Sequence, residues 1–242
     1  MKAIILAGGI GHRLRETVKR VPKPMAPVGD KPFLEYLVLQ LAKWKIKEII
    51  FSIGYKRDII KTYFGNGEKW GVQIKYSEED IPLGTGGGLR EAALFMDDDC
   101  FIVMNGDSFF EVDISRSINL HKEKNAIATL GLLRVDDTSR FGSVGIDKNG
   151  EILSFSEKGR GGSGLINGGV YIFNREIIEN IPPGKVSLEN DILPSLVKKG
   201  LYGVVAKGFF VDIGTPEDYL NLCKNPGELN SAIVGSSQAE SS

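Results

Sequence analysis

The sequence lacks an excess of charge of either sign, because its 242 residues carry 30 Lys+Arg against 31 Asp+Glu. This balance makes nucleic acid and anionic membranes poor first candidates for a partner. Cysteine is scarce as well, with Cys100 and Cys223 far apart, a usage that favours a reduced, cytoplasmic protein. No apolar run reaches the roughly 18 residues of a membrane span. The opening segment is too short and too rich in glycine for a signal peptide.

Histidine is equally rare, since His12 and His121 are the only two in the sequence. With two cysteines and two histidines, a zinc site is disfavoured. There is also no glycine-flanked serine of the kind that forms a nucleophile elbow, so a serine-hydrolase triad has poor support. Hydrophobic residues are nevertheless plentiful at 42%, which excludes disorder for most of the length.

Short, continuous apolar runs recur along the chain and predict strands that are buried on both faces, as in parallel sheets covered by helices. They lie at Ala3–Leu6, Glu48–Ile53, Gln73–Tyr76, Cys100–Met104, Ala126–Leu133, Gly169–Phe173 and Leu201–Val205. Helical patterns at Phe33–Ala42, Lys56–Tyr63 and Gly88–Leu94 separate the early runs. This alternation predicts an α/β fold with a Rossmann-like, open, mixed and mostly parallel sheet flanked by helices.

The second half of the chain is less regular. The stretch from Phe141 to Phe155, with Asp147–Gly150 as its turn, predicts a small inserted β-hairpin. Ser187 is a candidate cap for a helix that follows it. With no internal repeat and no clear linker, we expect a single domain over residues 1–225. The small and polar residues of 226–242 are expected to form a disordered C-terminal tail.

A glycine-rich turn follows the first predicted strand, in the sequence Leu6-Ala7-Gly8-Gly9-Ile10-Gly11-His12-Arg13-Leu14. Glycines allow close approach to a ligand, and consecutive free N–H groups at a strand end can bind an anion. Two familiar alternatives fail on spacing. The dinucleotide fingerprint needs a small residue where Leu14 stands, and the P-loop needs Lys-Ser/Thr after Gly164, where Leu165-Ile166 follows.

Basic residues cluster after this turn. Pro22 and Pro24 restrict the backbone on both sides of Lys23, and we predict that Lys23 and Arg13 supply positive charge for a polyphosphate. Arg15, Lys19 and Arg20 are interpreted as a solvated basic loop.

These motifs together resemble the signature of sugar-1-phosphate nucleotidyltransferases, over about residues 1–222. The resemblance continues past the glycine turn through Pro22-Lys23-Pro24-Met25-Ala26-Pro27-Val28, Pro82-Leu83-Gly84-Thr85-Gly86-Gly87, Asn105-Gly106-Asp107, Glu157-Lys158, Asn167-Gly168-Gly169-Val170-Tyr171-Ile172-Phe173 and Val211-Asp212-Ile213-Gly214-Thr215-Pro216-Glu217-Asp218-Tyr219. Within the family, the short heptose-1-phosphate guanylyltransferases look most similar. The motifs indicate the reaction more firmly than they indicate the base or the sugar.

The resemblance implies an enzyme that transfers a nucleoside monophosphate from an NTP, with GTP favoured, to a sugar 1-phosphate. The favoured acceptor is D-glycero-α-D-manno-heptose 1-phosphate, and pyrophosphate is released. Such a reaction needs positioning and charge neutralisation but no protein nucleophile. One alternative is a mannose- or glucose-1-phosphate nucleotidyltransferase with another base. A second, from another class, is a non-catalytic regulatory protein that binds nucleotide sugars. A homo-oligomer is left open.

The resemblance also implies roles for individual residues. By position alone, Asp107 and Asp212 each follow an apolar run and could equally cap a strand end; the family pattern makes both of them Mg²⁺ ligands. The catalytic set implied is Arg13, Lys23, Asp107, Lys158 and Asp212. The expected nucleotide contacts are Leu6, Ala7, Gly8, Gly9, Gly11, Glu78, Gly84, Thr85 and Gly86, and the expected sugar contacts are Asn105, Gly142, Glu157, Asn167 and Glu189.

The second glycine cluster, Gly84 to Gly88, is interpreted as a slot in which a flat base lies against backbone. Glu78 or Glu79 would accept the N1–H and N2–H donors of guanine, which adenine does not present. A plain flexible loop is the competing interpretation of this cluster.

Overall fold

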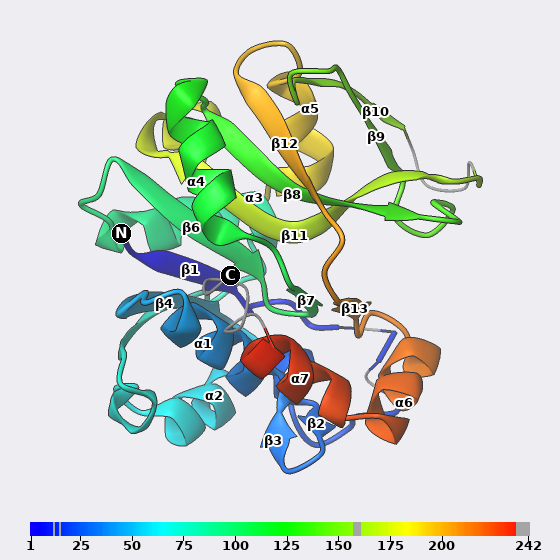
Figure 1. Cartoon of the computed structure of the whole chain (residues 1–242). Coiled ribbons are helices and arrows are strands. Elements are labelled where there is room, and N and C mark those ends of the chain that lie inside the picture. Colours follow the sequence, from blue (N-terminus) through cyan, green and yellow to red (C-terminus); the bar gives the residue numbers. More distant parts are fainter. Residues whose placement is uncertain (12, 15, 157–160, 236–242) are drawn as a thin grey trace.

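The computed structural model describes residues 1–11, 13–14, 16–156 and 161–235 (Figure 1). Within these residues, nine strands form one mixed sheet, in which β10-β9-β11-β6-β1-β4-β5 are successive neighbours and β8 joins β11 to β12. The strands are β1 (Ala3–Leu6), β4 (Glu48–Ile53), β5 (Gln73–Glu78), β6 (Cys100–Asn105), β8 (Ala128–Val135), β9 (Ser143–Ile146), β10 (Ile152–Ser156), β11 (Gly164–Asn174) and β12 (Leu201–Ala206). The predicted open, mixed α/β sheet is confirmed.

The parallel part of the sheet is its centre. β1 runs parallel to both neighbours, with Ala3 opposite Ile49 of β4 and Ile102 of β6. β5 continues this parallel set beyond β4, whereas β11 runs antiparallel to β6 and to β8. The carboxyl ends of β1, β4 and β6 therefore lie at one edge, where ligands usually bind in open α/β sheets.

Both faces of the sheet are buried. In β1, Ala3 and Ile5 belong to one hydrophobic core and Ile4 to the other, because successive side chains point to opposite faces. The first core is covered by α1 (Phe33–Lys43), α2 (Arg57–Phe64), α6 (Pro216–Lys224) and α7 (Gly227–Gly235). The second is covered by α3 (Gly84–Ala92) and by η4 (Arg175–Asn180), η5 (Leu188–Ile192) and α5 (Leu193–Ser195).

The remaining elements are short or peripheral. α4 (Ile114–Glu123) packs against β8 and β12. β7 (Ser108–Phe110) pairs with β13 (Phe210–Asp212), and β2 (Pro27–Val28) pairs with β3 (Lys31–Pro32). The single-turn helices are η1 (Lys23–Met25), η2 (Glu68–Trp70) and η3 (Ala93–Phe95).

The predicted hairpin and helix cap are confirmed. β9 and β10 pair antiparallel, and the Asp147 side chain accepts hydrogen bonds from the main-chain N–H groups of Asn149 and Glu151 in the turn. The Ser187 side chain accepts from Asn190 N at the start of η5.

The expected disordered tail is wrong for residues 227–235, which form α7. Leu229 is fully buried there, the helix packs against α1, and Lys43 Nζ donates to Ala232 O at 3.4 Å. Local sequence is a weak guide for so short a helix, because its stability comes from packing of its apolar face. Residues 236–242 lie outside the described part. None of the helices in the described residues has the length and apolar character needed to cross a bilayer.

His121 on α4 should make stability depend on pH. It is 4% exposed, with Nδ1 3.0 Å from Thr129 Oγ1, and burial lowers its pKa to about 4. Below pH 6.5, the ordinary pKa, His121 binds a proton in the unfolded chain but stays neutral in the folded chain. The free energy of unfolding therefore falls as pH falls. Between pH 7 and 5.5 we expect a loss of about 1 kcal/mol in urea unfolding. His121→Gln should remove most of this slope, and an unchanged slope would contradict the assignment.

Candidate active site

A cavity of about 400 Å³ opens at the carboxyl ends of β1 and β6. Among the predicted site residues, it is lined by Leu6, Ala7, Gly9, Gly11, Arg13, Lys23, Thr85, Asn105, Asp107 and Glu189. These residues come from the first loop, η1, α3, the end of β6 and η5. Residues far apart in sequence therefore meet at the edge of the sheet formed by the carboxyl ends of the parallel strands.

The glycine turn has a backbone that larger residues would disturb. Gly11 has φ +65°, and a Cβ there would stand 2.8 Å from the Cβ of Lys23. At Gly8, a Cβ would stand 2.6 Å from Glu79 Oε1, whereas nothing lies within 4 Å of a Cβ at Gly9. Gly11 thus lets Lys23 pack on the loop, and Gly8 leaves room for the Glu79 carboxylate.

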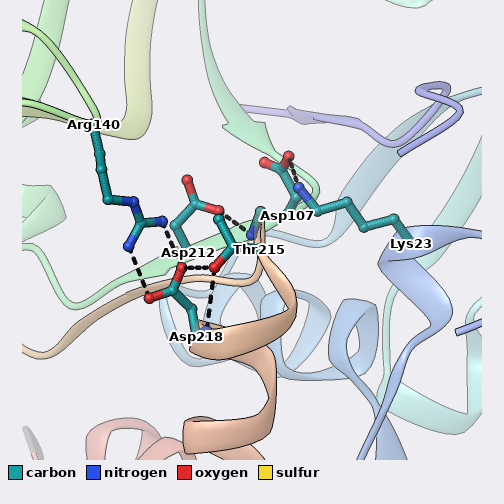
Figure 2. Close-up of polar contacts among 7 residues, drawn as sticks. Lys23, Asp107, Arg140, Asp212, Thr215 and Asp218 are labelled. Carbon is teal, nitrogen blue, oxygen red and sulfur yellow. Dashed lines mark hydrogen bonds and ion pairs between the residues drawn. The ribbon is translucent and has the colours of Figure 1, made fainter. Parts of the chain in front are cut away.

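Lys23 reaches across the site to Asp107. Its Nζ lies 2.6 Å from Asp107 Oδ2, and the two residues are 84 positions apart in sequence (Figure 2). The Lys23 side chain is 11% exposed and that of Asp107 is 41% exposed. A largely buried ammonium thus lies beside a carboxylate that solvent still reaches.

Asp212 is brought next to Asp107 by the pairing of β13 with β7. Asp212 lies opposite Ser108, and Ile213 N donates to Asp107 O at 3.0 Å. Burial raises the pKa of Asp212, as does the nearby charge of Asp107, while Lys23 and Arg140 act in the opposite direction. Gly214 N donates to Asp212 Oδ1.

This carboxylate pair suits a hard divalent cation. In the described part of the chain, no group of three or more His, Cys, Asp or Glu residues is arranged to hold a metal. Magnesium needs fewer protein ligands than that, because it is commonly bound by one or two carboxylates together with waters and phosphate oxygens. Burial and the charge of Asp107 both raise the pKa of Asp212, and a cation bound between the two carboxylates would relieve their repulsion.

Arg140 and Asp218 are site residues that the sequence analysis did not select. Figure 2 shows the Asp107 and Asp212 carboxylates between Lys23 and Arg140, with Asp218 bound to Arg140. Thr215 caps α6 by accepting from Asp218 N, and a Thr followed three residues later by an acid is a readable signal for such a cap. Arg140 has no comparable local signal.

The predicted sugar contacts form a partly connected group. Asn167 and Asn105 both donate to the Tyr171 hydroxyl, at 2.9 and 3.3 Å, and the Oδ1 atom of Asn105 is buried without a partner among the described residues. Glu189 accepts from Thr85 Oγ1 at 2.6 Å, which joins η5 to α3. Gly142, with φ +76°, lies in the loop before β9. Glu157 and Lys158 lie outside the described residues.

The second glycine cluster packs against protein on one side, whereas Gly84 is exposed and Thr85 lines the cavity. Gly86 N donates to Val186 O at 2.9 Å, and a Cβ at Gly84 would stand 2.5 Å from the same oxygen. A Cβ at Gly88 would stand 2.6 Å from Glu79 Oε1. These glycines let α3 approach the 184–188 segment and Glu79 on the side that a Cβ would occupy. Contact of a base with Gly84 and Gly86 stays a prediction.

Of the two candidate acids, Glu79 rather than Glu78 lies near the glycine loop. Glu78 forms ion pairs with Lys61 at 2.7 Å and with Arg57 at 3.1 Å, both on α2. Glu79 accepts from Ser52 Oγ at 2.9 Å and from Leu83 N at 3.0 Å, and with Gly8 it lines a second cavity of about 290 Å³. The choice of Glu78 therefore does not fit the geometry.

An open α/β sheet with a glycine loop, cations and paired carboxylates at its carboxyl edge defines a class of protein that binds phosphorylated ligands. A profile of the nucleotidyl transferase family matches residues 2–226. The chain therefore belongs to the nucleotidyl transferase family, a family of enzymes, as its motifs predicted.

Individual relatives are similar over most of the chain. D-glycero-alpha-D-manno-heptose 1-phosphate guanylyltransferase of Campylobacter jejuni is 41% identical, with 93% of this chain and 100% of the relative covered. The protein of the same name from Aneurinibacillus thermoaerophilus is 42% identical, with 90% and 95% covered. The structure of HddC from Yersinia pseudotuberculosis complexed with GMP-PN has a TM-score of 0.81 at 37% identity, with 92% of this chain and 98% of HddC covered.

Proposed function

We propose that this protein transfers GMP from GTP to D-glycero-α-D-manno-heptose 1-phosphate, forming a GDP-sugar and releasing pyrophosphate. The observation that carries the proposal is the cluster of Lys23, Asp107 and Asp212 beside the glycine loop. Two relatives named for this reaction, matched over 100% and 95% of their lengths, support the choice of base and sugar. The neighbour complexed with GMP-PN also favours guanine.

In this reaction an oxygen of the sugar phosphate attacks the α-phosphorus of GTP, and pyrophosphate leaves. Main-chain N–H groups of the glycine loop, with Arg13 and Lys23, would hold the triphosphate and neutralise the leaving group. Asp107 and Asp212 would bind Mg²⁺, which supplies charge neutralisation at the α-phosphate when bound. Lys158 would bind the phosphate of the sugar, while Glu157, Asn167 and Glu189 would contact sugar hydroxyls.

Mg²⁺ and a cytoplasmic location are parts of the same proposal. The two carboxylates suit magnesium better than zinc, given the scarcity of histidine and cysteine. Cys100 and Cys223 are both free thiols, which is the usual state in a reducing compartment.

The test is a matrix of GTP, ATP, CTP and dTTP against heptose, mannose and glucose 1-phosphates, with release of pyrophosphate as the readout. We expect Mg²⁺-dependent turnover to be highest for GTP with the heptose phosphate. A preference for dTTP or CTP would overturn the assignment of the base, and a preference for mannose or glucose 1-phosphate would overturn that of the sugar. No turnover with any pair would favour the regulatory alternative.

Glu79 should contribute to the choice of guanine. Its carboxylate uses two of about four acceptor positions on Ser52 and Leu83, which leaves two for the N1–H and N2–H donors of guanine. Glu79→Gln replaces one acceptor by a donor, so we expect kcat/KM for GTP to fall about 10- to 100-fold, with less effect on ATP. Glu78→Gln is the matched control, because Glu78 binds α2, and it should change the GTP/ATP ratio less than about twofold. An equal loss for GTP and ATP in Glu79→Gln would contradict a role in base selection.

A further inference from the structure

Arg140 joins two segments of the site that lie 78 positions apart in the sequence. Its guanidinium meets both oxygens of Asp218, with Nη1 2.9 Å from Oδ1 and Nη2 2.5 Å from Oδ2. Arg140 lies in the loop between β8 and β9, and Asp218 lies in the first turn of α6 (Figure 2). A bidentate arginine–carboxylate pair fixes orientation as well as distance.

Asp218 is in turn tied to the segment that carries Asp212. Its Oδ2 accepts from Thr215 Oγ1 at 2.5 Å, and its N–H donates back to Thr215 Oγ1 at 3.3 Å. Thr215 directly follows Gly214, whose N–H donates to Asp212. The Asp218 carboxylate thus connects Arg140 to the short turn that orients Asp212.

A second contact holds the same loop from the other side. The Phe141 ring packs edge-on against Phe210, with 5.8 Å between centroids and 72° between planes, and the Arg140 guanidinium lies 5.1 Å over the Phe141 ring. Phe210 begins β13 and Asp212 ends it. The loop that leads into Gly142 is therefore held against both ends of the Asp212 segment.

We propose that Arg140 is a positioning residue for the sugar 1-phosphate, an inference that rests on the proposed transferase function. Through Asp218, Arg140 holds the loop that leads into Gly142 at a defined distance from Asp212. The expected sugar contact at Gly142 and the carboxylate of Asp212 therefore keep a fixed separation. The described residues of the glycine loop, which lies between β1 and η1 and is expected to bind the triphosphate, take no part in the Arg140–Asp218 pair. Since a partly exposed ion pair contributes little to global stability, its loss affects substrate binding rather than folding.

The experiment compares Arg140→Met, Asp218→Asn and the double variant. We expect each single change to raise KM for the sugar 1-phosphate about 5- to 20-fold, with less than about twofold change in KM for GTP. The double variant should be no worse than the more severe single one, because both changes break the Arg140–Asp218 pair. Asp97→Asn is the control: it removes an exposed ion pair with Lys2 at the opposite edge of the sheet and should leave both KM values unchanged.

A near-normal KM in Asp218→Asn, or additive losses in the double variant, would show that Arg140 meets the substrate directly and would overturn the positioning role. Amide hydrogen exchange over residues 138–142 gives a readout that needs no turnover. It should be faster in both single variants, and unchanged exchange would also overturn the proposal. If the parent chain forms no nucleotide sugar, the proposed function fails, while the exchange measurement still decides whether Arg140 holds the loop.

Discussion

Asp212→Asn is expected to lower kcat about a thousandfold while making the fold more stable. The loss of activity follows from removing one of two carboxylates that would hold the divalent cation, since a bound metal contributes several kcal/mol to stabilising the developing charge. Asparagine keeps the shape of the side chain and an oxygen that can accept from Gly214 N. The local backbone should therefore survive.

The gain in stability follows from the raised pKa of Asp212. Burial and the charge of Asp107 both disfavour the ionised form in the folded protein. A raised pKa means that the ionised carboxylate costs folding energy that a neutral asparagine does not. Activity and stability thus move in opposite directions, as is common when a charged site is built for function.

The measurements are kcat under saturating substrates, the thermal midpoint, and Mn²⁺ binding in the absence of substrates. Glu217→Gln, which removes an exposed acid on the same segment, should change none of the three appreciably. Activity within about threefold of the parent would exclude Asp212 as a metal ligand. A lower thermal midpoint would mean that its role is structural.

The central strands could be predicted from sequence because they are buried on both faces. β1 and β4 have the bounds that their apolar runs predicted, and both are flanked by helices that the periodicity also indicated. In such strands nearly every residue is apolar, so the signal is continuous. The short strands β7 and β13 were missed, because a strand of three residues is too short to give a continuous signal.

The site residues likewise divide into those that a local motif predicts and those that only the fold brings together. Lys23 and Asp107 were found because each belongs to a local motif, although their 2.6 Å contact depends on the fold. Arg140 was missed because its role depends on its ion pair with Asp218, which lies 78 positions away on a helix that no local sequence pattern connects to Arg140. Glu78 and Glu79 are adjacent acids on a strand end, and only the position of α2 decides which of them faces the glycine loop.

Lys23→Met is expected to lower kcat/KM by tenfold to several-hundredfold. A charge-assisted contact to the triphosphate contributes about 1.5–3 kcal/mol, and each 1.36 kcal/mol changes a rate about tenfold. Methionine retains an unbranched side chain that can pack on Gly11, so the change removes the ammonium and little else. Turnover within threefold of the parent, in a folded variant, would contradict this role.

The same variant should bind Mn²⁺ more tightly when no nucleotide is present. In the parent, the Lys23 ammonium lies 2.6 Å from Asp107 Oδ2 and competes with a cation for that carboxylate. Its removal leaves the repulsion between Asp107 and Asp212 less compensated, with Arg140 still present, and a divalent cation relieves that repulsion. Titration of Mn²⁺ should therefore show a higher affinity in Lys23→Met and a lower one in Asp212→Asn. A lower Mn²⁺ affinity in both variants would mean that Lys23 supports the metal site instead of competing with the cation. In that case the carboxylates could bind a cation without the triphosphate first drawing the Lys23 ammonium away from Asp107.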